Sequence, residues 1–403
     1  MIRNEDILLF KKSGEPGLET SHRSRTALLI RRLIAESIEV GATDIHVEPE
    51  EGKVRIRARV DGFLRDVTEY DTASGMKVVA AIKVLCDLDI TRKHRMQDGS
   101  FSAKVEGRLV EFRVSSVEEL QGDKMVIRIL ETRPEVIDMQ RLGLPAATET
   151  ELRGFLRQSQ GMLLVSGPTG SGKSTTLYSL LREVDRKQRN VVAIEDPIEY
   201  RLDYVTQIAV DAKHGVTFAS ALRNSLRQDP NIIMLGEIRD AETAQIAIQA
   251  GLTGHLVFST VHARDSAATV HRLLDLDIEA FLVANVINVS LAQRLVRILC
   301  RACRKKAAPE RALAEKFGMD PGEQVWEAAG CDVCQGAGYR GRTGVFELMR
   351  VTKRIQGLIM DRGREDDIRK VAIEEGMLPI QRAAMEKVRV GVTSMAEVNR
   401  VLG

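Results

Sequence analysis

The sequence predicts an α/β protein: a parallel-sheet domain that follows a smaller α+β domain and precedes a cysteine-rich module and a helical C-terminal segment. Three observations support this. A glycine-rich string, GPTGSGKST, separates a strand pattern from a helix pattern. Short apolar segments alternate with helix patterns through the middle of the chain, as parallel strands joined by helical crossovers require. Two C-x-x-C pairs lie downstream.

Composition places the chain among soluble globular proteins. Its 403 residues suffice for two or three domains, and 44% are hydrophobic and 29% charged. A formal net charge of +2 indicates no strongly basic surface for nucleic acid, and only 4% of the residues are aromatic and could stack on bases. No apolar run approaches the roughly 18 residues that span a bilayer. Glu5 and Asp6 stand where a signal peptide would be basic, so we expect a cytoplasmic protein.

The N-terminal third is expected to form an arm and a small domain. Residues 1–22 are interpreted as a flexible arm, because Gly14, Pro16 and Gly17 interrupt regular structure. Residues 23–133 are expected to form the α+β domain, with a hairpin at Asp61-Gly62, and residues 134–146 a linker. The expected elements of the small domain are helices over 26–40 and near 75–88, and strands over 44–49, 53–60, 108–114 and 124–130. Cys86 is expected to be a core residue.

The sheet domain is expected over residues 147–295. Its core strands are predicted at 162–165, 191–194, 232–235 and 256–259, with a helix at 241–250 between the last two. Beyond about residue 270 the strand signal fades. A cysteine module over 296–345 and a helical segment over 346–403 are expected to follow.

The glycine-rich string is typical of a phosphate-binding loop. Gly167, Gly172, Lys173 and Ser174 fill the pattern G-x-x-x-x-G-K-[ST] between a strand and an apolar-periodic helix. Glycines let backbone N–H groups crowd an anion, and the helix N-terminus adds free donors and a positive dipole end. Lys173 would reach the β- and γ-phosphates, and the Ser174 hydroxyl would ligate Mg²⁺. The expected nucleotide contacts are Gly167, Pro168, Thr169, Gly170, Ser171, Gly172, Lys173, Ser174 and Thr175.

Two further strands end in carboxylates. Glu195 follows one, together with Asp196 and Glu199, and Glu237 follows the other. Because ligands bind beyond the carboxyl ends of the strands in an open α/β sheet, these side chains are expected beside the phosphate loop. Glu237 can hold the metal's water shell or polarise the attacking water. The sequence leaves open which of Glu195 and Glu237 is the general base.

Basic side chains offer further candidates. His255 and His262 bracket the strand over 256–259 and suggest a sensor of the γ-phosphate. Arg223 and Arg227 are four residues apart, a spacing that places both on one face of a helix. That face is either solvated or directed at a transferring phosphate, where an arginine accelerates the reaction by about 10³ to 10⁵.

The paired cysteines predict a metal. Cys300 and Cys303 form one C-x-x-C pair, and Cys331 and Cys334 form the other. Two short chelating loops present four thiolates, the arrangement of structural zinc sites. With all four positions filled by protein, the zinc would be structural and not catalytic.

Taken together, the motifs resemble the secretion ATPases that drive type II secretion and type IV pilus assembly. The strings that carry this likeness are GPTGSGKSTTLYSLL, AIEDPIEY, LRQDPNIIMLGEIRDAETA, GLTGHLVFSTVHA and GYRGRTGVFEL with the cysteine pairs, and, in the first domain, GATDIHVEP, RARVDGFLRDV, MQDGS and VEFRVSS. The likeness runs from about Thr26 to the C-terminus and is highly specific. It implies a RecA-like ATP-binding domain, a PAS-like N-terminal domain and a homohexameric ring in which a neighbour closes over the nucleotide.

The resemblance also implies roles for individual residues. Glu195 falls in the family's Asp box, Glu237 in its Walker B segment and His262 in its His box. Arg113 and Arg128 match first-domain arginines that reach the nucleotide, whereas Arg223 and Arg227 match arginines of the RecA-like side. The four cysteines match one for one, which separates the chain from the pilus retraction ATPases. A polytopic inner-membrane platform protein is the implied partner, and the resemblance implies peripheral association with the cytoplasmic face of the membrane through such partners.

Two departures from the family pattern stand out. Members commonly carry a further N-terminal domain that docks on the membrane assembly, whereas about 25 residues precede the likeness here. Docking on the membrane assembly would then use another surface of this chain, or the sequence is part of a longer protein. The family's Gln-Asp-Gly-Arg is Gln97-Asp-Gly-Ser100 in this chain, which removes one cation.

The sequence is compatible with three functions. The first is a hexameric Mg²⁺-dependent ATPase that powers pseudopilus or pilus assembly. The second is a RecA-like motor that moves nucleic acid, which the near-neutral charge and few aromatic residues disfavour. The third is a nucleotide-gated scaffold that binds ATP and zinc but hydrolyses little.

Overall fold

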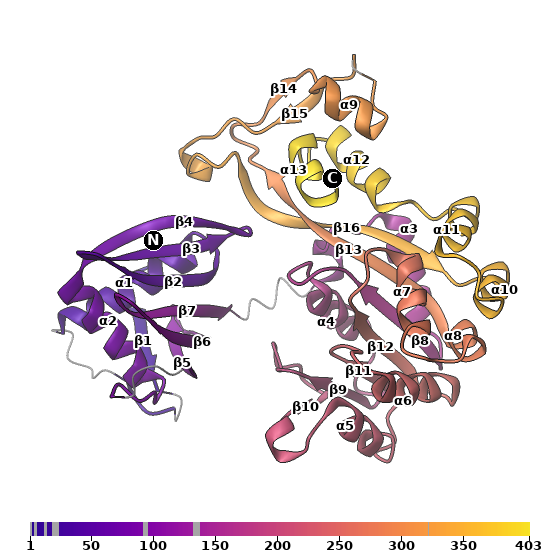
Figure 1. Cartoon of the computed structure of the whole chain (residues 1–403), viewed down its shortest axis with the longest axis horizontal. Helices are drawn as coiled ribbons and strands as arrows, with labels where there is room; N and C mark the ends of the chain where they lie inside the picture. Colours follow the sequence, from indigo (N-terminus) through magenta and orange to yellow (C-terminus); the bar gives the residue numbers. More distant parts are fainter. Residues whose placement is uncertain are drawn as a thin grey trace. The chain divides into compact units, whose positions relative to one another are not determined.

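Figure 1 shows a computed structural model of the chain, which describes residues 2–3, 6–11, 14–17, 24–91, 96–131, 138–320 and 322–403. The chain forms two compact units, Met1–Arg133 and Pro134–Gly403. Each unit contains a seven-stranded sheet. None of the helices within the described ranges combines the length and apolar character needed to cross a bilayer.

The first unit is an antiparallel sheet with two helices. The strand order is β1-β5-β6-β7-β2-β3-β4. The elements are β1 (Ile7–Phe10), α1 (Arg25–Glu39), β2 (Ala42–Glu50), β3 (Lys53–Val60), β4 (Phe63–Asp71), α2 (Thr72–Leu85), β5 (Gln97–Val105), β6 (Arg108–Glu119) and β7 (Gly122–Glu131). β4 and β5 were not predicted from the sequence, because their buried and exposed positions alternate less regularly than those of β3.

The two faces of this sheet follow from the alternation of its residues. Along β3, Val54, Ile56, Ala58 and Val60 are buried, and the basic residues between them are partly exposed. The buried row packs with residues of α1 and α2 into one apolar core, which contains Cys86 as expected. Asp61 and Gly62, both with positive φ, form the two-residue turn that pairs Val60 with Phe63, as the hairpin signal predicted.

One part of the expected flexible arm is structured. Ile7–Phe10 forms β1, which pairs with β5 at the edge of the sheet. Ile7 and Leu9 point into the core and are almost fully buried. The prediction of an arm over 1–22 was therefore wrong for these residues, because burial of two apolar side chains and a strand ladder outweighs the glycine and proline that follow. Residues 18–22 of the expected arm lie outside the described residues.

The second unit is built on a largely parallel sheet. The strand order is β10-β9-β11-β12-β8-β13-β16, in which only the last pair is antiparallel. The strands are β8 (Gly161–Ser166), β9 (Val191–Glu195), β10 (Thr206–Ala209), β11 (Ile232–Leu235), β12 (Leu256–Val261), β13 (Ile287–Leu299) and β16 (Tyr339–Arg350). All four predicted core strands are present, and β8 lies in the middle of the sheet between β12 and β13.

Helices cover both faces of this sheet. On one face lie α3 (Ala146–Leu156) and α4 (Lys173–Glu183), which share a core with β8 and β9 (Figure 1). The other core contains residues of α5 (Phe218–Ser225), α6 (Ala241–Leu252), α7 (Ser266–Leu274), α8 (Ala280–Val286), α10 (Lys353–Met360) and α11 (Glu365–Glu374). A third core joins α9 (Arg311–Phe317), α12 (Ile380–Arg389) and α13 (Met395–Leu402) to the far ends of β13 and β16. A small two-stranded antiparallel sheet of β14 (Lys305–Ala307) and β15 (Val325–Glu327) belongs to the same end.

Two expected boundaries differ from the structure. Part of the expected linker over 134–146 is packed: Met139 and Leu142 are buried against the core around α4, and residues 139–141 form a 3₁₀ turn. The expected boundaries at 295/296 and 345/346 fall inside β13 and β16, which pair along most of their length. The strand signal was missed here because these long strands alternate buried and partly exposed residues and carry many charges.

Candidate active site

A glycine-rich loop joins the buried strand β8 to helix α4. β8 ends at Ser166, α4 begins at Lys173, and Gly172 occupies the N-cap position with a φ of 87°. Gly167 and Gly170 also have positive φ values, 150° and 77°. Glycine adopts these values at little cost. No side chain among the described residues caps α4, so its first backbone N–H groups remain available to an anion.

The loop leaves no room for side chains at two of its glycines. A Cβ atom on Gly167 would lie 2.5 Å from the backbone oxygen of Gln293, and one on Gly172 would lie 2.9 Å from its Nε2. The Oγ atom of Ser171 is buried and has no hydrogen-bond partner among the described residues. A close-packed backbone, free helix donors and an unpartnered hydroxyl fit a phosphate chain.

Lys173 lies over the loop. Its Nζ atom donates to the carbonyl oxygens of Gly167 at 2.9 Å and Pro168 at 3.1 Å. Burial lowers the pKa of Lys173, and the nearby carboxylate of Glu237 opposes this shift. The ammonium group is thus held at the loop and within electrostatic reach of Glu237.

Glu237 and His262 meet at the same edge of the sheet. They follow β11 and β12, which pair in parallel beside β8. Nε2 of His262 lies 3.7 Å from Oε2 of Glu237, and Arg239 contacts the other carboxylate oxygen. The Glu237 side chain is 17% exposed, so solvent reaches it. The structure therefore brings Lys173, Glu237 and His262 together, although they are widely separated in the sequence.

Glu195 has a different environment. It ends β9 and is buried, and its two carboxylate oxygens accept hydrogen bonds from the Tyr178 hydroxyl and from Nε2 of Gln207 at 3.0 Å. Burial raises the pKa of Glu195, and these hydrogen bonds offset part of the shift. Glu195 thus joins α4, β9 and β10, whereas Glu237 faces the loop lysine.

His255 lies away from this edge. It precedes β12 at the amino end of the strand, and its Nδ1 lies 3.0 Å from the carbonyl oxygen of Ala250. Its own carbonyl accepts from the N–H of Gly161, at the start of β8. Of the two histidines suggested as a γ-phosphate sensor, only His262 lies at the carboxyl edge of the sheet, because a six-residue strand separates it from His255.

The four cysteines gather as predicted. Cys300 follows β13, and Cys331 and Cys334 precede β16. The four sulfur atoms of Cys300, Cys303, Cys331 and Cys334 lie within 4.8 Å of one another. All four thiols are free, and the N–H groups of Cys331 and Gly338 donate to Sγ of Cys334 at 3.2 Å. Four sulfurs at this spacing fit a tetrahedral metal ion such as zinc.

Residues 19–400 match the family model described as type II/IV secretion system protein. The chain belongs to this family. Type II secretion system protein E of Klebsiella pneumoniae is 41% identical over 373 residues, which cover 93% of this chain and 75% of that protein. Type II secretion system ATPase E of Vibrio cholerae is 41% identical over 390 residues, 96% of this chain and 77% of that one.

A pilus protein is similar to the same extent. The type IV pilus assembly ATPase PilB of Acinetobacter baylyi is 40% identical over 380 residues, which cover 92% of this chain and 65% of PilB. As a member of the secretion family with relatives named ATPases, the chain is an ATP hydrolase.

Solved structures show the same fold. The ATPase DotB of Legionella pneumophila superposes with a TM-score of 0.70 at 21% identity, covering 95% of this chain and 97% of DotB. The pilus retraction motor PilT superposes with a TM-score of 0.63 at 24% identity, covering 92% of this chain and 95% of PilT. The second unit is therefore RecA-like, as the resemblance implied.

Two arginines expected on one helix face of this secretion-family ATPase are arranged differently. Arg223 lies in α5 and its Nη2 pairs with Oε1 of Glu242 at 2.8 Å. α5 ends at Ser225, so Arg227 lies in the turn beyond it, where it donates to the Arg223 carbonyl at 3.2 Å. The helix is shorter than the spacing assumed.

The first-unit arginines of this family member are cross-strand neighbours. Arg113 on β6 stands opposite Arg128 on β7, and Ser100 on β5 stands opposite Arg113. Arg128 also pairs with Asp44 at 3.1 Å. Ser100, where the resemblance implies an arginine, thus lies in the same cross-strand row as both arginines.

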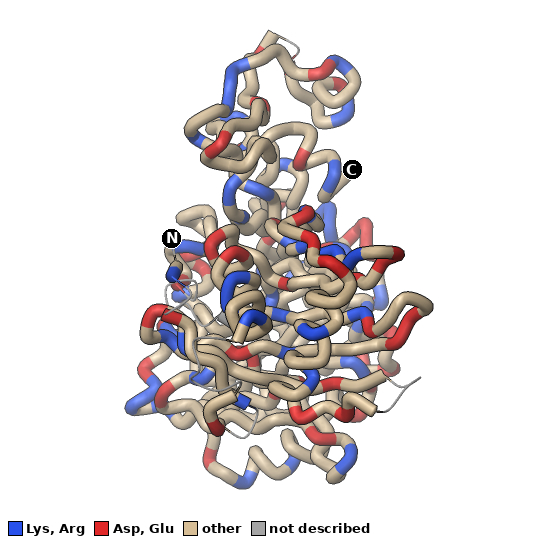
Figure 2. The backbone as a smooth tube through the Cα atoms, turned by 90° about the vertical axis from the view of Figure 1, so that its left-hand side faces the viewer, with Lys and Arg blue, Asp and Glu red and all other residues tan. Residues whose placement is uncertain are grey.

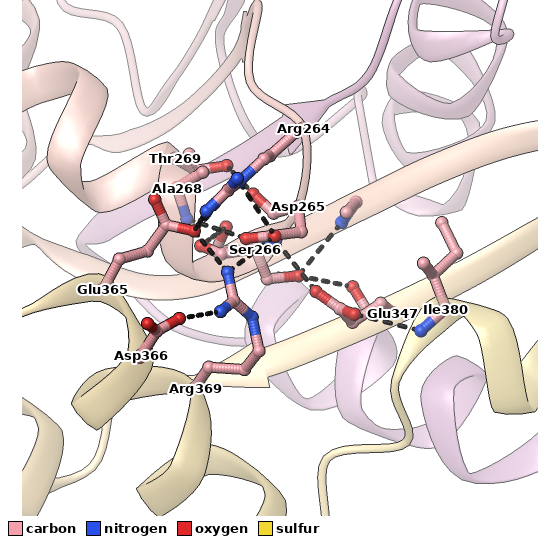
Figure 3. Close-up of polar contacts among 12 residues, drawn as sticks. Arg264, Asp265, Ser266, Ala268, Thr269, Glu347, Glu365, Asp366, Arg369 and Ile380 are labelled. Atoms are coloured by element: carbon pink, nitrogen blue, oxygen red, sulfur yellow. Dashed lines mark hydrogen bonds and ion pairs between the residues drawn. The ribbon is translucent and has the colours of Figure 1, made fainter. Parts of the chain in front are cut away.

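The segment after His262 is anchored to the C-terminal helices. Figure 3 shows Arg264, Asp265 and Ser266 at the start of α7 beside Glu365 and Arg369 of α11. Asp265 caps α7 and its second oxygen accepts from Arg369 at 2.8 Å. The buried carboxylate of Glu347 accepts from the N–H groups of Ser266 and Ile380, at the starts of α7 and α12. The loop that carries His262 is therefore continuous with a polar network that reaches two later helices.

Sequence reasoning missed Gln293. This residue of β13 is 1% exposed and hydrogen-bonds the phosphate loop. The available signal was a glutamine inside the apolar string VSLAQRLV, where an uncharged polar side chain must find buried partners.

Proposed function

We propose that this chain is a Mg²⁺-dependent ATPase that works as a homohexamer and powers assembly of a type II secretion pseudopilus or a type IV pilus through an inner-membrane platform protein. The observation that carries the proposal is the convergence of Lys173, Glu237 and His262 at the carboxyl edge of one parallel sheet. The relatives named type II secretion ATPase E and PilB support this class of machine.

The phosphate loop would bind ATP. N–H groups of the loop and of the first turn of α4 would face the phosphates, and Lys173 would exchange its contacts with the Gly167 and Pro168 carbonyls for the β- and γ-phosphates. Ser174, exposed at the second position of α4, would hold Mg²⁺. When bound, Mg²⁺ neutralises charge on the phosphate oxygens.

Glu237 is the better candidate for the general base. It is partly exposed beside Lys173 and His262, where it can orient a water molecule and accept its proton. Glu195 is buried and both of its oxygens are already hydrogen-bonded. His262, on the other side of Glu237 from Arg239, would contact the γ-phosphate.

The four arginines would complete the site in a ring. Arg113 and Arg128 belong to the first unit, and Arg223 and Arg227 lie at the end of α5. In a hexamer such a cation can be supplied to a neighbour's phosphates, where a single arginine finger is worth about 10³ to 10⁵ in rate. Turnover would then depend on assembly.

The cysteine cluster would hold a structural zinc ion. All four ligand positions would be filled by protein, so no position remains for a reacting water. The ion would fix the loops at the ends of β13 and β16.

The machine would operate in the cytoplasm at the face of the inner membrane, attached through its partners. A role on nucleic acid receives no support, because basic and acidic residues intermingle along the backbone (Figure 2) and aromatic residues make up only 4% of the chain.

The test uses the purified full chain. Size-exclusion chromatography with light scattering would identify the hexamer, and phosphate release would be measured on each fraction. Lys173→Ala should abolish turnover, whereas Lys187→Ala, at an exposed lysine after α4, should leave it unchanged. Unchanged turnover in Lys173→Ala, or monomers as active as the ring, would refute the proposal. Deletion of the gene should prevent assembly of a pilin-like fibre.

A further inference from the structure

The side chain of Gln293 joins strand β13 to the phosphate loop. Its Nε2 donates to the carbonyl oxygen of Ser171 at 2.8 Å, and its Oε1 accepts from the Thr176 hydroxyl at 2.7 Å. Gln293 is 1% exposed and Thr176 is fully buried. The side-chain amide of Gln293 therefore hydrogen-bonds both the loop just before α4 and the first turn of α4 itself.

The backbone of Gln293 lies against the loop as well. Its carbonyl oxygen would be 2.5 Å from a Cβ atom on Gly167. Arg294 donates to this carbonyl at 3.0 Å from Nη1, and to the carbonyl of Arg264 at 2.6 Å from Nη2. Gln293 is thus held between its strand, the loop and the segment that follows His262.

The hydrogen bond to Ser171 determines where a phosphate-binding donor points. In a trans peptide the C=O of one residue and the N–H of the next point in opposite directions. Because the Ser171 carbonyl is directed at Gln293, the N–H of Gly172 is directed away from Gln293. Gly172 lies on one side of this peptide, with a φ of 87°, and glycine imposes little preference of its own on the peptide's orientation.

We propose that Gln293 is a positioning residue for nucleotide binding, which holds the Ser171–Gly172 peptide so that its N–H faces the phosphates. The inference deepens the proposed function and depends on ATP binding at this loop. Without the amide, the Ser171 carbonyl and the Thr176 hydroxyl would be buried without partners, and the peptide would be free to rotate. Gln293 does not touch the substrate; it acts through the loop.

Asn288 provides a matched control. It lies on the same strand, and its side chain also bonds the backbone of β8, accepting from the Met162 N–H at 3.0 Å. This contact is at the opposite end of β8 from the phosphate loop. Asn288→Leu therefore removes an amide contact from β13 to the amino end of β8, whereas Gln293→Leu removes the contacts from β13 to the loop and to α4.

The test is an equilibrium titration of the full chain with a fluorescent ATP analogue in the presence of Mg²⁺, below the melting temperature of each variant. Gln293→Leu is expected to raise Kd about tenfold or more. Asn288→Leu is expected to change Kd by less than about twofold while lowering Tm similarly. Thr176→Val, which removes only the hydroxyl, should raise Kd to a smaller extent, and Thr176→Ser, which restores it, should bind like the parent chain.

The outcomes separate this inference from the proposed function. If the parent chain fails to bind MgATP, the proposed function is wrong. If Lys173→Ala loses binding but Gln293→Leu retains it, or if Asn288→Leu weakens binding equally, only the positioning role is refuted. Should Gln293→Leu fail to fold, a Kd for Thr176→Val equal to that of Thr176→Ser would overturn the inference.

Discussion

Nε2 of His262 lies 3.7 Å from Oε2 of Glu237, across the ends of the adjacent parallel strands β12 and β11. This pair distinguishes the two glutamates that the sequence could not separate. Glu237 shares a solvent-accessible edge with a titratable side chain and lies near Lys173. Glu195 is buried against Tyr178 and Gln207.

Replacement of each glutamate should have a different effect. Glu237→Gln keeps the shape but removes the proton acceptor, so kcat should fall by about 10² to 10⁴ while Kd for MgATP changes little. Glu195→Gln should mainly lower the melting temperature. Steady-state phosphate release and calorimetric melting measure the two effects. If a folded Glu195→Gln variant lost more kcat than Glu237→Gln, Glu195 and not Glu237 would be the general base.

The buried Glu195 should also give the protein a characteristic pH dependence. Burial raises its pKa above the ordinary value of 4.5, so the folded state binds this proton more tightly than the unfolded state does. Its contribution to the free energy of unfolding therefore falls as pH rises from about 4.5 to the raised pKa, and is constant above it. Urea unfolding of the parent chain and Glu195→Gln across this range should show a steeper loss for the parent. Parallel curves would contradict the burial argument.

Two glycines of the loop should respond differently to alanine. Gly167→Ala would place a Cβ atom 2.5 Å from the Gln293 carbonyl, so the loop must shift and MgATP binding should be lost. Gly170→Ala meets open space and adds only the strain of a positive φ, about 1 to 2 kcal/mol. Nucleotide titration of both folded variants checks this. Equal losses of MgATP affinity in the two variants would indicate that the conformational freedom of the glycines matters more for binding than the close packing at Gly167.

The cysteine cluster should bind one zinc ion per chain. Cys334→Ser should abolish zinc binding and destabilise the surrounding loops, because metal binding contributes folding free energy on the order of 10 kcal/mol in structural sites. Elemental analysis would measure the metal. Trp326, the single tryptophan, would report unfolding, since the Arg304 guanidinium lies 4.4 Å from its ring centroid. Cys86→Ala, in the first unit, is the control and should retain full zinc content.

The network at the start of α7 should contribute to stability. Arg369 bonds Asp265 and Asp366 and also contacts Glu365 (Figure 3). Arg369→Ala would leave partly buried carboxylates without this partner, at a cost of about 1 to 3 kcal/mol. Arg354→Ala serves as the control, because its partners Glu374 and Glu375 belong to α11 and the residue after it. Chemical unfolding followed by circular dichroism compares them, and equal effects would argue against a special role for the α7 anchor.

Much of the fold could be predicted because its signals are local. The alternation of Val54, Ile56 and Ala58 with arginines identifies β3, and the apolar run before Gly167 identifies β8. Turn chemistry located the hairpin at Asp61-Gly62. β13 was missed because its sequence contains buried polar residues and arginines. One of these, Arg297, hydrogen-bonds Glu397, a residue far along the chain.

The candidate site was predicted in part. The loop residues and the cysteines were found because each belongs to a short motif: the glycine-rich string for the loop, and two C-x-x-C pairs for the cysteines. Arg227 was placed wrongly, because the last residue of a short helix cannot be read from spacing. The function of Gln293 depends on a contact between residues 122 positions apart.

The sequence by itself determined that a phosphate loop begins α4, that four thiols can share one metal ion and that the chain is a secretion-family ATPase, because these features reside in short runs of residues. Only the tertiary structure decided that Glu237 and not Glu195 faces Lys173, that His262 and not His255 lies beside it, and that Gln293 supports the loop. The reason is physical: strand order and direction determine which strand ends meet, and burial determines whether a carboxylate is hydrogen-bonded in the interior or exposed to water.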